Sequence, residues 1–210
     1  MAATYTRPIG LEPTQYLSGA KWNGQCQLYY THPSNSDTIY INDLVTLDTS
    51  NRGSGTGTKF VGLPAIAKYA AGGTVVRGVV VGFLPQPFFT HSATASLGLK
   101  YRVASTARWA LVVDDAGVLF EAEEINTGTL LTVAAIGKNI DVSVVAGDSS
   151  IGISKTVLDN GTENTTATLP LKLYRLVQRE GNDFGAANPT FGVRWEVKMN
   201  TNDLVSATGL

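Results

Sequence analysis

The residues best suited to acid–base chemistry or to binding a hard cation form two short acidic groups: Asp114 and Asp115, followed by Glu121, Glu123 and Glu124. Neighbouring carboxylates of this kind can exchange a proton with a substrate or ligate Ca²⁺. In a strand over 118–125, alternation puts Glu121 and Glu123 on one face and Glu124 on the other, with Asp114 and Asp115 in the preceding turn. This pattern favours a solvated hairpin edge, where charges oppose edge-to-edge association, over a catalytic site.

Nucleophilic, phosphate-binding and metal chemistry each lack a necessary partner. His32 and His91 lie in loop-like segments, and neither is near a G-x-S-x-G turn that would present a nucleophile. The glycine-rich stretch 53–57 lacks the Gly-Lys-Ser/Thr ending of a phosphate loop. Cys26 is the sole cysteine, and one Cys with two His cannot complete a four-ligand zinc site. We therefore expect no enzyme activity, no cofactor and no bound metal.

Charge and hydropathy argue against two further partner classes. Lys and Arg number 16 against 17 Asp and Glu, so the net charge of -1 does not favour nucleic acid. The mean hydropathy is +0.05, but no run of about 18 apolar residues would span a membrane. The N-terminal residues lack the apolar core of a signal peptide. We expect a folded chain made in the cytoplasm, with no nucleic-acid or membrane partner.

Strands dominate the expected secondary structure, because β-branched and aromatic runs alternate with Gly, Asn and Asp turns. The fold class that we expect is all-β, in three parts. Residues 1–38 form an extended N-terminal arm, rich in aromatic residues, that packs on its own domain or on a neighbouring subunit. Residues 39–90 form a small β-barrel-like unit that ends near a Pro-Gln-Pro sequence. Residues 91–210 form a larger antiparallel β-sandwich or barrel.

Three segments carry the most specific local predictions. Residues 193–199 alternate without exception between apolar and charged side chains, which predicts a strand with one buried face. Residues 74–84 are almost continuously apolar, which suits a strand covered on both faces, with Gly78 and Gly82 marking a bulge or a close backbone approach. Residues 129–136 are the sole candidate for a short helix, ended by Gly137.

Two parts of the sequence resemble a known class of viral proteins. The stretches "ARWALVVDDAGVLFEAEE", "AAIGKNIDVSVVAGDSSIGISKTVLD" and "TTATLPLKLYRLVQREGND" look like the C-terminal half of cement, or decoration, proteins of tailed bacteriophages. The upstream "IYINDLVTLD" and "GLPAIAKYAAGGTVVRGVVVGF" are similar to the small β-barrel unit of such proteins. Together these stretches lie within residues 39–200.

The resemblance implies a structural virion protein without catalytic residues. Such a protein binds the outer surface of an icosahedral head and joins neighbouring capsomers against the pressure of packed DNA. Its implied partners are the major capsid protein and further copies of itself, as a dimer or a trimer. Because these proteins act through surface area, no family site residue carries over to this chain.

Aromatic residues in loop-rich segments are the candidate anchors for such an interface, since buried aromatic rings dominate binding energy. The candidates are Trp22, Tyr29, Tyr30, Phe88 and Phe89. Three alternatives stay open: a head-fibre base or tail component, a carbohydrate-binding β-sandwich that stacks aromatic rings on sugars, and an enzyme that uses the acidic segment 114–124.

Overall fold

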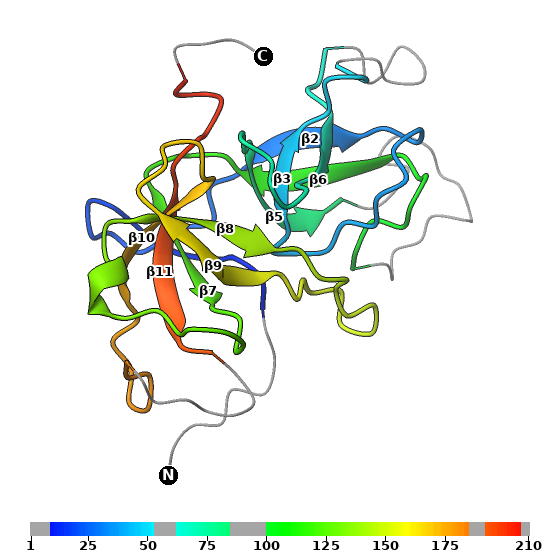
Figure 1. Cartoon of the computed structure of the whole chain (residues 1–210). Helices are drawn as coiled ribbons and strands as arrows, with labels where there is room; N and C mark the ends of the chain where they lie inside the picture. The colour runs from blue at the N-terminus through cyan, green and yellow to red at the C-terminus, as the bar shows by residue number, and fades with distance from the viewer. Residues whose placement is uncertain (1–8, 53–61, 85–99, 185–191, 207–210) are drawn as a thin grey trace.

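The computed structural model describes residues 9–52, 62–84, 100–184 and 192–206, which form two antiparallel sheets (Figure 1). The larger, sheet A, has the order β1-β7-β11-β10-β8-β9, and the smaller, sheet B, has the order β2-β6-β5-β3-β4. The expected all-β class is confirmed. The strands of sheet A are β1 (Glu12–Tyr16), β7 (Val118–Glu123), β8 (Asn139–Ser143), β9 (Val157–Asn164), β10 (Leu171–Leu176) and β11 (Arg194–Met199). Those of sheet B are β2 (Gln27–Thr31), β3 (Leu44–Leu47), β4 (Ile66–Lys68), β5 (Gly78–Phe83) and β6 (Arg108–Val113).

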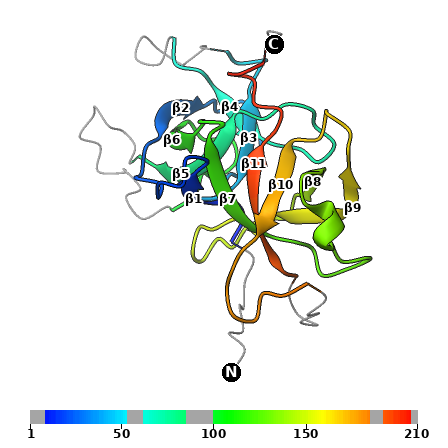
Figure 2. The same cartoon turned by 90° about the vertical axis from the view of Figure 1, so that its left-hand side faces the viewer.

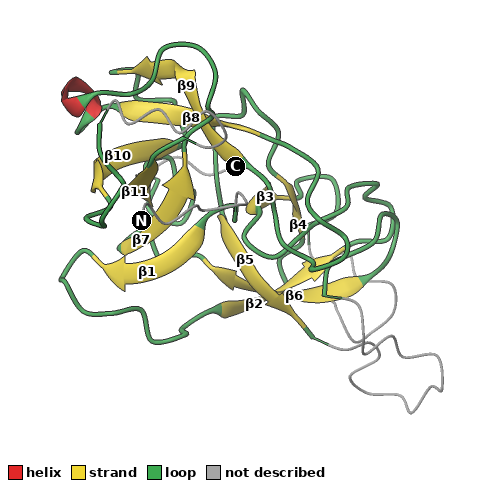
Figure 3. Cartoon of the chain, turned by 90° about the horizontal axis from the view of Figure 1, so that it is seen from below, coloured by secondary structure: helices red, strands yellow, loops and turns green. Residues whose placement is uncertain are grey.

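The two sheets lie side by side as two lobes, as the view from below also shows (Figure 3). Figure 2 follows sheet A from β1 through β7 and β11 to β9. One hydrophobic cluster joins the lobes, because it contains Val79 and Val113 of sheet B together with Phe120 and Trp195 of sheet A. A second cluster, around Val80 and Val112, lies on the other face of sheet B.

Strand β5 is covered on both faces, as its apolar sequence predicts. Val79 packs into the shared cluster, and Val80 packs into the cluster on the opposite face. The two glycines mark the predicted features. The register with β6 shifts between Val80 and Gly82, and a Cβ on Gly78 would lie 2.6 Å from Cγ1 of Val112.

The expected N-terminal arm contributes a strand to each sheet. Strand β1 pairs with β7 in sheet A, and β2 pairs with β6 in sheet B. Strand β6, from the part expected to form a separate C-terminal domain, also joins sheet B. The expected boundaries near 38 and 90 therefore do not coincide with the division into sheets.

Each sheet curls without closing into a barrel among the described residues. In sheet B a single parallel bridge links Tyr30 of β2 to Ala65, just before β4. In sheet A a similar bridge links Glu124, after β7, to Leu158 of β9. The predicted short helix is one 3₁₀ turn, η1 (Val133–Ala135), and Gly137 follows it with a positive φ of 86°. No helix in the described ranges is long and apolar enough to cross a membrane.

Candidate functional site

The acidic group after Asp115 is buried, so the expectation of a solvated hairpin edge is wrong. The turn at 114–117 carries the chain from sheet B to sheet A, where β7 lies between β1 and β11. Glu121, Glu123 and Glu124 are all buried there. The expectation failed because the strands that cover β7 come from the two ends of the chain.

Hydrogen bonds within the protein occupy both oxygens of two of these three carboxylates. Glu121 accepts from Nη1 of Arg194 at 2.8 Å and from Nη2 of Arg179 at 2.9 Å. Glu124 accepts from the indole N–H of Trp195 at 2.8 Å and from the backbone N–H of Leu131 at 3.1 Å. No group of three metal-ligating side chains occurs among the described residues. These contacts give Glu121 and Glu124 a structural role.

Glu123 has a less satisfied environment. Nε of Arg194 lies 3.7 Å from its Oε2, which is an ion pair but not a hydrogen bond, and this oxygen has no hydrogen-bond partner. Burial raises the pKa of Glu123 to about 7, against the opposing effects of Arg194 and of a hydrogen bond from the backbone of Gly192. A carboxyl that titrates near neutral pH can serve as an acid or base where a substrate reaches it. Neither groove described below is lined by Glu123.

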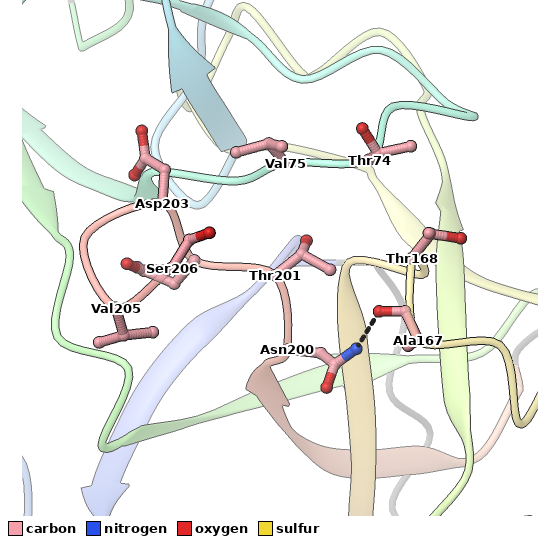
Figure 4. Close-up of a pocket in the computed structure, with 10 residues that line it drawn as sticks. Thr74, Val75, Ala167, Thr168, Asn200, Thr201, Asp203, Val205 and Ser206 are labelled. Atoms are coloured by element: carbon pink, nitrogen blue, oxygen red, sulfur yellow. Dashed lines mark hydrogen bonds between the residues drawn. The ribbon is translucent and has the colours of Figure 1, made fainter. Parts of the chain in front are cut away.

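A groove at the junction of the two lobes is the candidate site for a partner (Figure 4). Its volume is about 620 Å³, within the range of ligand-binding clefts. Three segments line it: 74–75 before β5, 167–168 before β10, and 200–206 after β11, without Leu204. Hydroxyl groups of Thr74, Thr168 and Thr201 and the methyl groups of Val75 and Val205 give it mixed character. A smaller groove of about 220 Å³ lies beside η1.

Two asparagines fix the segment after β11 in this position. Nδ2 of Asn200 donates to the carbonyl oxygens of Ala167 and Leu169 in the sheet A lobe, at 3.0 and 2.9 Å. Nδ2 of Asn202 donates to those of Arg77 and Asp114 in the sheet B lobe, at 3.1 and 3.0 Å. Residues 200–206 are thus hydrogen-bonded to the sheet A lobe through Asn200 and to the sheet B lobe through Asn202. We call this segment the strap.

Two polar atoms in the groove lining are buried without a partner. Oδ2 of Asp203 accepts two hydrogen bonds from Arg77, at 3.0 and 2.6 Å. Its Oδ1 has no partner, although the side chain is only 2% exposed. Oγ1 of Thr201 is buried and unpaired as well. Such atoms cost free energy in the folded chain, and because they are buried they lie behind the contact surface of the groove and not on it.

An exposed apolar turn adjoins the groove. Val205 is 68% exposed and Leu204 is 52% exposed, which are high values for aliphatic side chains. Apolar side chains exposed to this extent beside a polar-rimmed groove are typical of a protein contact surface.

The predicted aromatic anchors lie elsewhere. Tyr29 and Tyr30 are buried in the cores of the sheet B lobe, so their assignment to an external interface is corrected. Trp22 is half-buried in the loop between β1 and β2. Phe88 and Phe89 lie outside the described residues. The groove has no sequence signature, because its Thr, Val, Ala, Ser, Asn and Asp residues come from three separate segments and form no motif in any of them.

Comparisons with known proteins found no matching family, no matching curated protein and no matching solved structure for this chain.

Proposed function

We propose that this chain is a decoration protein of a tailed bacteriophage, which binds the outer surface of the head and cements neighbouring capsomers. The supporting sequence evidence is the resemblance of residues 39–200 to such proteins. The supporting structural observation is the groove at the junction of the lobes, with the exposed Val205 in its lining. This surface provides apolar contact area and the exposed hydroxyl groups of Thr74 and Thr168 for another protein.

A decoration protein cements two capsomers if its contacts with them must break before the capsomers can separate. The free energy of those contacts then adds to the cost of separation. A protein that contacts more than one capsomer, or that is linked to further copies of itself, raises the effective concentration of each next contact. Such multivalency increases avidity by about 10²- to 10⁴-fold over a single contact. Modest individual contacts such as this groove are therefore sufficient, and no chemical step is needed.

The test is reconstitution on phage heads prepared without this chain. Purified protein is added back, and occupancy is measured by quantitative mass spectrometry and electron microscopy. Wild-type protein should bind in hundreds of copies per head. Val205→Asp should lower occupancy at equal concentration by about tenfold or more, because it places a charge in the contact surface.

Val133→Asp is the matched control. Val133 is 66% exposed, close to the 68% of Val205, but it lies in η1 on the sheet A lobe, away from the groove. This variant should bind heads as the wild type does. A handful of copies per virion would instead indicate a fibre base or tail component. Failure to bind heads together with a positive glycan array would replace the proposal with the carbohydrate-binding alternative.

A further inference from the structure

The loop between β1 and β2 contains one of the two Asn-Gly pairs in the chain, Asn23–Gly24; the other is Asn160–Gly161. Asn followed by Gly is prone to deamidation. The backbone nitrogen of the glycine attacks the side-chain amide of the Asn, and glycine has no Cβ to hinder this attack. In this loop a Cβ on Gly24 would meet nothing within 4 Å, and Asn23 is exposed.

The hydrogen bonds of Asn23 favour this reaction. Its Oδ1 accepts from the hydroxyl of Tyr16 at 2.9 Å and from the backbone N–H of Gln25 at 3.1 Å. The bond from Gln25 closes an Asx turn, which folds the side chain back over its own backbone. Both donors point at the oxygen that becomes negative when the amide carbon is attacked. They are arranged as an oxyanion hole is around a reacting carbonyl.

We propose that Asn23 is a site of spontaneous deamidation promoted by Tyr16. The backbone nitrogen of Gly24 forms a bond to Cγ of Asn23, and the bond from Cγ to Nδ2 breaks. Nδ2 leaves as ammonia, with the proton from Gly24 delivered through solvent. Water then opens the resulting succinimide at either carbonyl, which gives aspartate or isoaspartate at position 23.

Asn160 provides an internal comparison with the same local sequence step. Its Nδ2 donates to the carbonyl oxygens of Ile125 and Thr127, at 3.0 and 2.9 Å. Its backbone lies within β9, so neither the leaving nitrogen nor the attacking amide is free to move. In the folded protein, Asn160 is expected to resist the reaction that Asn23 undergoes.

The modification would add a negative charge beside Trp22, whose indole N–H donates to the carbonyl of Gln25 at 3.2 Å. It would therefore change the chemistry of the exposed loop as the protein ages. The inference does not depend on the proposed role on phage heads.

The experiment is peptide mapping by mass spectrometry after incubation of the folded chain at mildly alkaline pH. The readout at each Asn is the mass change on exchanging ammonia for water, with isoaspartate resolved by chromatography. We expect Asn23 to react much faster than Asn160, and the two rates to converge in urea. Tyr16→Phe keeps the ring but removes the donor, and should slow Asn23 about fivefold, the rate equivalent of one hydrogen bond.

Equal rates at Asn23 and Asn160 in the folded chain would overturn the assignment of the site. A Tyr16→Phe rate equal to or above that of the wild type would overturn the role of Tyr16. Gly24→Ala serves as a second variant: a Cβ hinders the attack and is strained at the positive φ of 87°, so Asn23 should react more slowly than in the wild type, and an unchanged rate would contradict attack by this nitrogen.

Discussion

The guanidinium of Arg102 is fully buried, and its donors all go to oxygen acceptors. Nε donates to the carbonyl of Thr106 at 2.9 Å, and Nη2 donates to the carbonyls of His32 and Asn35 at 2.8 and 2.7 Å. Nη1 donates to Oδ1 of Asn35 at 3.1 Å and to the carbonyl of Asp37. Arg102 thereby fixes the loop after β2 to the segment before β6.

Arg102→Lys should therefore destabilise the fold although it keeps the charge. A lysine ammonium has three donors at one point and cannot reach all of these oxygen atoms, and each partly buried acceptor left unpaired costs up to about 1–3 kcal/mol. We expect the free energy of unfolding in urea to fall by several kcal/mol. Arg175→Lys, on an exposed side chain, should change it by less than about 0.5 kcal/mol. Equal effects of the two variants would contradict this role of Arg102.

Glu123 should make stability depend on pH in an unusual direction. Burial raises its pKa from 4.5 to about 7 on folding, so between these values the folded state binds more protons than the unfolded state. The free energy of unfolding should then decrease as pH rises through this range, and this contribution should level off above about pH 7. Glu123→Gln should make that decrease smaller, whereas Glu12→Gln, at an exposed position, should leave it as in the wild type. Urea unfolding at a series of pH values between 4.5 and 7 measures this dependence. If the free energy of unfolding of Glu123→Gln changes with pH as steeply as that of the wild type, Glu123 is not its cause.

At the scale of the element, the two glycines of β5 should differ in how well they tolerate a side chain. A Cβ on Gly78 would lie 2.6 Å from Cγ1 of Val112 and nearer still to the carbonyl oxygen of Val113. A Cβ on Gly82 would lie 3.6 Å from Leu111, an ordinary contact. Gly78→Ala should therefore lower the free energy of unfolding by about 1–3 kcal/mol or more through overpacking. Gly82→Ala should change it by less than about 1 kcal/mol. Similar losses in both variants would show that the close approach at Gly78 is not what limits the strand.

The sequence predicted those strands whose pattern of apolar and polar residues corresponds to the faces that are buried. The alternation of β11 identified its buried face, since Trp195, Val197 and Met199 are all buried. The apolar run and glycines of β5 predicted its double coverage and its bulge. Gly137 correctly ended the single helical turn.

Features that depend on distant pairing could not be predicted in the same way. The environment of β7 is set by β1, more than a hundred residues earlier, and by β11, about seventy residues later. The local pattern of glutamates does not indicate that β1 and β11 pair with this strand. The two tyrosines of β2 likewise looked like surface anchors because the strand that pairs with them, β6, is distant in sequence. The groove needs segments from three parts of the chain, and none is distinctive alone.

At the scale of the whole molecule, the two lobes share a core and the strap. The shared cluster takes Leu44, Val79 and Val113 from the sheet B lobe and packs them with strands of sheet A. Asn202 is buried and donates to carbonyls of Arg77 and Asp114, while Arg77 also binds Asp203 of the strap. Opening the junction would therefore expose apolar surface and leave polar groups unpaired.

The lobes should consequently unfold together rather than one after the other. Hydrogen exchange measured by mass spectrometry in increasing urea should give the same free energy of opening for β5 and β6 as for β10 and β11. Asn202→Ala removes the donor from two partly buried carbonyls and should lower that free energy by about 1–3 kcal/mol in both lobes at once. Asn164→Ala, at an exposed site at the end of β9, should leave both values unchanged. If Asn202→Ala lowers the free energy of opening in one lobe alone, the strap stabilises only that lobe. The shared cluster would then not couple the two lobes.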